Sequence, residues 1–249
     1  MEYSKLISLF SKNRLNRYVQ VCNGDQSKAV SLYECNIRLS QALHPLISLL
    51  EVGLRNAIDR EICKHYNDNE WLINQRHDFA NHIDLTYKDY QGNVQSDTFF
   101  MDKLQKAEGK IKFGGGNVTH VKLIAELTFG FWVKFFDNCP IKVLKGVPLQ
   151  SFKNRPSIKL KDVHSHLNKV VTLRNRISHN EPICFNKQGG LCLTTIKAYE
   201  DDIISALGWI DSDLKDWGEG INGFPPIYDS IVTLQKPTIY TMKIEALAP

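Results

Sequence analysis

The chain has 249 residues, of which 43% are hydrophobic and 23% are charged, and its 31 basic and 27 acidic residues leave a net charge of +4. This composition is close to that of an average soluble globular protein, and it excludes a disordered chain, a collagen-like repeat and a low-complexity tail. Because the net charge is small, any affinity for nucleic acid must come from a local basic patch.

The six cysteines form no CxxC pair, and the first residues contain no apolar signal-peptide core. Both features predict reduced thiols in a cytoplasmic protein. The most apolar segment, residues 123–136, contains Glu126 and Lys134 and is shorter than the roughly 20 residues that span a bilayer. We therefore expect a buried helix there and no membrane partner.

The first half of the chain predicts helices. Residues 25–33 can cap and open one, and apolar side chains recur every three or four positions over 34–63. Pro45 falls within this run, so the sequence predicts either a kink or a second helix that begins there. Residues 82–118 are expected to form a polar insertion that contains one amphipathic helix near 97–110.

The second half predicts a dense apolar helix over 121–136, followed by helices over 160–178 and 194–210. The last 30 residues contain prolines and show a weak strand-like alternation, which predicts a partly irregular or β-like extension over 213–249. We therefore expect an all-α fold in which residues 1–212 form one helical domain that carries this extension.

Two neighbouring segments carry opposite charge. Residues 153–176 hold seven Lys and Arg against one acid, whereas residues 200–219 hold seven acids against one lysine. The two segments can attract one another within or between protomers, or the basic one can line a groove for a polyanion such as RNA. The candidate RNA-binding residues of the basic segment are Lys159, Lys161, Lys169 and Arg176.

The most informative segment is LRNRISHNEPI at 173–183. On a helical wheel Arg174 falls in the middle of the apolar stripe, where an arginine must be paired in the core or face a cleft or a protein interface. Pro182 disfavours helical geometry at the preceding residue, so the helix is expected to end near 178–180. That end would leave His179 free to turn toward Arg174.

A histidine and an arginine in one cleft suit the cleavage of a phosphodiester. Histidine titrates near neutrality and can move the proton of a ribose 2′-hydroxyl or of the leaving 5′-oxygen, while arginine binds the charged phosphate oxygens. No metal is then needed, and His164 and His166 point apart on a helix, so no zinc site is expected. On spacing alone, the alternative is a purely structural role. The basic side chains would then interact favourably with the dipole at the C-terminus of the helix, and backbone carbonyl groups would bind the histidine.

The residues from Arg174 to His179 resemble the Arg–polar–x3–His signature of HEPN ribonucleases. Three wider blocks look like the hallmarks of the Abi-like (AbiD/AbiF) abortive-infection family within the HEPN superfamily, namely LRNRISHNEPI at 173–183, LEVGLRNAIDREI at 50–62 and ELTFGFWVKFF at 126–136. The segment SLYECNIRLSQAL at 31–43 fits the opening helix of the family. The resemblance covers roughly residues 1–210.

This resemblance implies a HEPN-type helical bundle that forms a homodimer, needs no cofactor and cleaves RNA in bacterial phage defence or in a toxin–antitoxin system, with an RNA or protein antitoxin as a partner. Arg174 and His179 would be catalytic, and Asn175 would orient them. Many relatives have a second histidine where this chain has Asn180. The alternative is a non-catalytic, dimeric RNA- or protein-binding module.

The supporting residues are Glu51, Arg55, Asn180 and Glu181. Glu51 and Arg55 are four residues apart, which is the spacing of a helix-surface ion pair. The resemblance implies instead that their block faces the motif helix and supports it.

Overall fold

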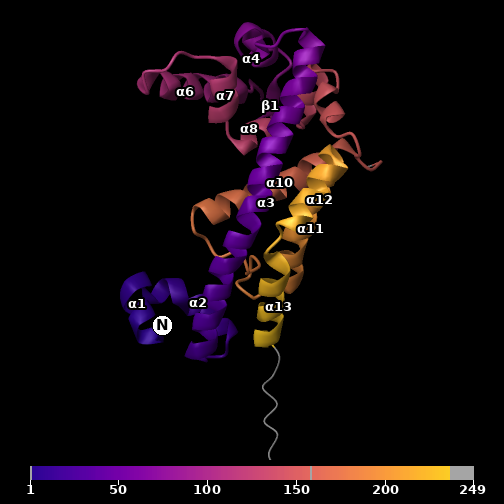
Figure 1. The fold of residues 1–249 in the computed structure, drawn as a ribbon. Helices are drawn as coiled ribbons and strands as arrows, with labels where there is room; N and C mark the ends of the chain where they lie inside the picture. Colours follow the sequence, from indigo (N-terminus) through magenta and orange to yellow (C-terminus); the bar gives the residue numbers. More distant parts are fainter. Residues whose placement is uncertain (1, 158, 236–249) are drawn as a thin grey trace, which may run out of the picture.

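A computed structural model describes residues 2–157 and 159–235, and this part of the chain is mostly α-helical (Figure 1). Its spine is α3 (Gln26–Tyr66), a helix of 41 residues. Packed along α3 are α2 (Lys12–Val21), α10 (Leu160–Ser178), α11 (Leu193–Ile210) and α13 (Phe224–Gln235). The predicted all-α fold is confirmed.

Helix α3 begins where the sequence predicts and does not stop at its proline. The side chain of Asp25 accepts a hydrogen bond from the backbone N–H of Lys28 at 2.9 Å, which caps the first turn. Pro45 lies on the exposed face of the helix, where water can bind the carbonyl group that its missing N–H leaves free. The helix continues through it, so the alternative of a second helix at Pro45 is wrong.

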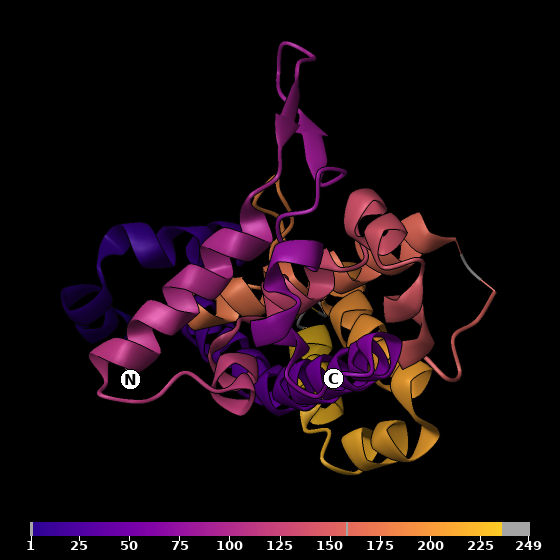
Figure 2. The same ribbon diagram turned by 90° about the horizontal axis from the view of Figure 1, so that it is seen from above.

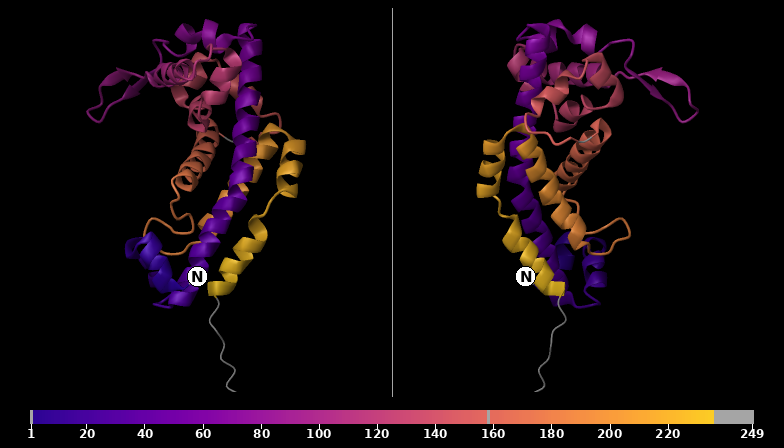
Figure 3. Two further views of the ribbon diagram at one scale, coloured as in Figure 1. Left: turned by 60° about the vertical axis from the view of Figure 1, so that its left-hand side comes forward. Right: turned by 90° about the vertical axis from the view of Figure 1, so that its right-hand side faces the viewer.

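The polar insertion lies at one end of α3 and follows two short helices, α4 (Trp71–Asn74) and α5 (Arg76–Phe79). It holds the expected amphipathic helix as α6 (Phe99–Phe113). It also holds an antiparallel hairpin that the sequence analysis did not predict, formed by β1 (Thr86–Lys88) and β2 (Val94–Ser96). The hairpin projects away from the helices (Figures 2 and 3).

The apolar segment 121–136 forms two helices rather than one. Helix α7 (His120–Glu126) ends before Leu127, whose backbone is extended, and α8 (Phe129–Lys134) then begins. A single helix would spread the aromatic side chains of 129–136 around its whole circumference. With the break at 127–128, the apolar side chains of residues 129–136 are all buried, as predicted for this segment. They are Phe129, Phe131, Trp132, Val133, Phe135 and Phe136.

After α8 the chain forms α9 (Asn138–Val143) and the short 3-10 helix η1 (Val147–Ser151), and then α10 with the predicted bounds. The described part of the C-terminal extension is helical, as α12 (Ser212–Gly220) and α13. None of the described helices is long and apolar enough to cross a membrane.

The β-like character expected for the extension is wrong for its described residues. Ile231 and Thr233 lie in α13, and Ile231 is fully buried where this helix packs on α3. The two prolines of α13, Pro225 and Pro226, lie in the first turn of this helix, where a missing N–H costs no helical hydrogen bond. Ile239 and Thr241, which completed the strand-like alternation, lie outside the described residues.

All six cysteines are free thiols, and Cys192 differs from the others because it caps α11. Hydrogen bonds with the hydroxyls of Thr194 and Thr195, 3.2 and 3.1 Å from its Sγ, lower the pKa of Cys192 to about 7. Burial raises the pKa of Cys63 to about 11 and that of Cys184 to about 12.

The thiolate is the reactive form, so we expect iodoacetamide to label Cys192 first near neutral pH and Cys184 last. A time course of alkylation, read by peptide mass spectrometry on the folded protein, measures the order. Labelling of Cys63 before Cys192 would contradict the predicted order of thiol pKa values. The same time course in denaturant serves as the control, because it should remove the difference.

Candidate functional site

The motif helix α10 ends one residue before His179, as predicted from Pro182. The N–H groups of Asn180 and Glu181 donate to the carbonyl groups of residues 177 and 176 at 3.0 and 2.8 Å. Asn180 adopts a left-handed backbone with φ 55°, and this pattern is the Schellman turn that commonly closes a helix. Asparagine is one of the few residues other than glycine that tolerate this backbone. The turn fixes the backbone on both sides of His179.

Two residues that the sequence analysis missed anchor the segment after His179. Asn36, buried on α3, accepts hydrogen bonds at its Oδ1 from the backbone N–H groups of Ile183 and Cys184 at 2.8 and 3.3 Å. Arg14, on α2, donates from Nη2 to the carbonyl oxygen of Asn180 at 2.6 Å. A polar residue on the otherwise apolar face of α3 was the available signal for Asn36.

Arg174 extends from α10 toward α3. Its Nε lies 3.6 Å from Oε2 of Glu51, and the two side chains are 37% and 19% exposed. Glu51 therefore faces the motif helix, and the alternative of a surface ion pair between Glu51 and Arg55 is not what the structure contains. The Nε of Arg55 is buried and has no hydrogen-bond partner among the described residues.

His179 lies at the surface, where a substrate can reach it. Its imidazole is exposed and makes no hydrogen bond or ion pair within residues 2–157 and 159–235. Arg174 and Asn175 line a separate cavity of about 230 Å³, next to Thr128, and His179 does not line it. One protomer therefore does not gather the three predicted catalytic residues in this cavity.

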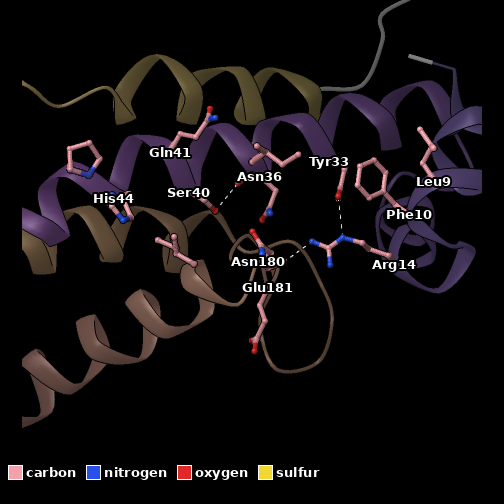
Figure 4. A pocket seen from close by; sticks show the side chains of 13 residues that line it. Leu9, Phe10, Arg14, Tyr33, Asn36, Ser40, Gln41, His44, Asn180 and Glu181 are labelled. Carbon is pink, nitrogen blue, oxygen red and sulfur yellow. Dashed lines mark hydrogen bonds between the residues drawn. The ribbon is translucent and has the colours of Figure 1, made fainter. Parts of the chain in front are cut away.

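A larger cavity lies beside the turn at Asn180 and Glu181 that follows His179 (Figure 4), and His179 does not line this cavity either. It has a volume of about 950 Å³ and lies between α1 (Tyr3–Phe10), α2, α3 and the turn at residues 180–181. We call it the motif groove. The residues that line it are Leu9, Phe10, Arg14, Tyr33, Asn36, Ile37, Ser40, Gln41, His44, Pro45, Ile177, Asn180 and Glu181.

A family model described as Abi-like protein matches residues 2–184. The chain belongs to the Abi-like family. The match includes α3, α8 and α10 and ends in the segment that Asn36 anchors, so it contains every residue of the motif. Membership suggests a role in abortive infection, a bacterial defence against phage. Neither a curated protein nor a solved structure matches the chain.

In this Abi-like protein, part of the predicted RNA-binding set is engaged within the chain. Lys169 lies 3.9 Å from a carboxylate oxygen of Asp202. Arg176 donates to the carbonyl oxygen of Pro182 and to the hydroxyl of Tyr199, and its Nε lies 3.6 Å from Glu181. Arg176 therefore helps to hold the turn after His179.

Lys159 and Lys161 are exposed but lie at the other end of α10. At 1.5 Å per residue, they are separated from His179 by roughly 27 Å along the helix axis. The structure thus divides the basic segment into one part that is paired with acidic residues and another that is remote from the motif turn.

One group among the described residues has the composition of a metal site. Ligand atoms of Asp59, Cys63 and His120 lie within 4.8 Å of one another. However, Oδ1 of Asp59 already accepts from the indole of Trp71 at 2.7 Å and contacts Nε2 of His120 at 2.9 Å. Burial and the neighbouring Asp59 carboxylate raise the pKa of Cys63 to about 11, which keeps its thiol protonated. These contacts form a network that connects α3 to α4 and α7.

His164 and His166 do not converge on one site. Nε2 of His164 lies 2.5 Å from Oδ1 of Asp137, whereas Nδ1 of His166 lies 3.2 Å from Oδ1 of Asp202. The two imidazoles therefore contact acids on different elements, as the spacing of two residues on a helix implies.

Proposed function

We propose that this Abi-like protein is a metal-independent endoribonuclease of the HEPN type, related to AbiD and AbiF, that acts in phage defence or in a toxin–antitoxin system. The observation that carries the proposal is the exposed imidazole of His179, which has no partner in the described part of the chain and lies on a turn, closed by backbone hydrogen bonds, at the edge of the motif groove. Histidine is suited to proton transfer near neutral pH, and a fixed backbone supplies the positioning that such catalysis needs.

His179 takes the proton from a ribose 2′-hydroxyl or gives one to the leaving 5′-oxygen. The 2′-oxygen forms a bond to phosphorus while the bond to the 5′-oxygen breaks, so the products carry 2′,3′-cyclic phosphate and 5′-hydroxyl ends. Arg174 stabilises the charge that grows on the non-bridging oxygens, and Asn175 orients the pair. An RNA or protein antitoxin restrains the activity.

The different surroundings of Arg174 and His179 support a homodimer as the active form. Each protomer presents the two groups in different places, since Arg174 lines the cavity near Thr128 and His179 lies at the end of α10. We propose that a second motif helix completes the site, so that an arginine of one protomer and a histidine of the other reach the same phosphate.

A non-catalytic RNA- or protein-binding dimer is the second candidate. It is favoured by the 3.6 Å contact between Arg174 and Glu51, since a carboxylate beside the guanidinium reduces the charge available to a phosphate. The two candidates differ in whether RNA is cut.

The test is incubation of the purified protein with total bacterial RNA in excess EDTA, followed by mapping of the fragment ends. Cleavage that leaves cyclic-phosphate ends is the expected result. Activity that the chelator abolishes would overturn the metal-independent mechanism. Intact RNA that is nevertheless bound would support the non-catalytic candidate. A preparation from cells without the gene, purified in parallel, controls for contaminating ribonuclease.

A further inference from the structure

The motif groove has a wall of exposed aromatic and aliphatic side chains. Phe10 is 46% exposed, its neighbour Leu9 is 57% exposed, and Ile37 on α3 is 42% exposed. The ring of Phe10 lies 6.0 Å from the ring of Tyr33, centroid to centroid. Farther along α3 from Tyr33, the groove is lined by the polar side chains of Ser40, Gln41 and His44 (Figure 4). An exposed aromatic ring with hydrogen-bonding groups farther along the same groove suits a flat, polar-edged ligand such as a nucleobase.

The charge around the groove favours an anion. Residues 3–21, which include α1 and α2, contain Lys5, Lys12, Arg14 and Arg17 and no acid. Among the described residues, Glu181 is the only acid that lines the groove, and its carboxylate lies 3.6 Å from the Nε of Arg176. Of these four basic residues Arg14 lines the groove, whereas the basic residues of α10 are either paired or remote from the motif turn.

Arg14 connects this basic surface to the motif. Its Nε donates to the hydroxyl of Tyr33 at 3.1 Å and its Nη2 donates to the carbonyl oxygen of Asn180 at 2.6 Å. These two bonds hold the guanidinium at the groove wall, one residue from His179, and leave Nη1 without a hydrogen bond in the described part of the chain. A phosphate bound there would lie beside the turn that follows His179.

We propose that the motif groove binds an unpaired nucleotide of the RNA, with Phe10 as the platform on which the base stacks and Arg14 beside its phosphate. The proposal rests on the proposed function, because it identifies single-stranded RNA as the substrate class of the same site. A base must be unstacked from its neighbours to reach such a platform, so duplex RNA does not enter the groove. The volume of about 950 Å³ is within the range of sites that enclose small ligands.

The test measures binding separately from cleavage. The wild-type protein and the Phe10→Ala and Phe113→Ala variants are each combined with His179→Ala, so that the RNA stays intact. Affinity is measured by fluorescence anisotropy with a short, fluorescein-labelled single-stranded RNA of mixed sequence. Phe113 is the matched control because it is 97% exposed at the end of α6.

Phe10→Ala is expected to weaken binding by about fivefold or more, which is the lower limit for the loss of one base–aromatic stack. Phe113→Ala and Phe10→Trp should bind as the parent does, and the duplex form of the same RNA should not respond to Phe10→Ala. Thermal melting of each variant shows that the exposed substitution leaves the fold unchanged.

Equal affinity of the Phe10→Ala and Phe113→Ala variants would overturn the proposal, and so would the absence of RNA binding by every variant. If Phe10→Ala instead shifts the monomer–dimer equilibrium in sedimentation while RNA affinity stays constant, the groove is covered by a second copy of the chain and the proposal is wrong. Failure of the wild type to cut RNA would count against the proposed function alone, since binding is measured in inactive protein.

Discussion

If the proposed ribonuclease activity holds, replacement of His179 with alanine is expected to slow RNA cleavage by at least about 100-fold, the lower limit of what a positioned acid or base contributes. The imidazole is exposed and unpaired in the described part of the chain, so its loss removes no contact that holds the fold. The turn around it is closed by backbone hydrogen bonds, which alanine keeps. We therefore expect the loss of activity to occur without a change in the melting temperature.

The measurement is the single-turnover rate of cleavage in EDTA, together with thermal melting. His77→Ala is the matched control, because His77 is also exposed but lies on α5, away from the motif turn. Its rate should equal that of the wild type. Cleavage by His179→Ala at the rate of the His77→Ala control would remove His179 from the mechanism and point to a contaminating enzyme or a different site.

Features set by neighbouring residues could be predicted from the sequence. The cap at Asp25, the bounds of α10 and the end of the motif helix near Pro182 all follow from residues within a few positions of one another. The density of apolar residues also identified part of the core, since the aromatic residues of 129–136 are buried as expected. These signals are local, and local preferences here agree with the final fold.

The parts that were not predicted depend on contacts between distant residues. Asn36 and Ile183, which are 147 positions apart, form a hydrogen bond that no local pattern reveals. The break before α8 depends on where its aromatic side chains can be buried, and the pairing of Lys169 with Asp202 depends on how α10 packs on α11. The charge pattern alone left open whether the basic segment was paired or free, and the structure shows that part of it is paired.

Substitution of Asn36 by leucine is expected to destabilise the protein by about 2–4 kcal/mol, since two buried N–H groups lose their acceptor. Ile183 and Cys184 are fully buried, so water cannot replace the Asn36 oxygen. Leucine keeps most of the side-chain volume and favours a helix, so the loss reports the hydrogen bonds rather than a cavity. For a chain of this size the melting temperature should fall by about 5–15 °C.

The same change should also reduce RNA cleavage at a temperature where the variant is folded, because the segment that follows His179 loses its anchor on α3. Asn56→Leu is the matched control, since Asn56 is an exposed asparagine of the same helix, and it should alter neither the melting temperature nor the rate. Denaturation curves and cleavage rates of the two variants show whether Asn36 holds the segment that follows His179. If Asn36→Leu melts with the control, the motif turn is held without Asn36, and the contacts of Arg14 and Arg176 are sufficient to position it.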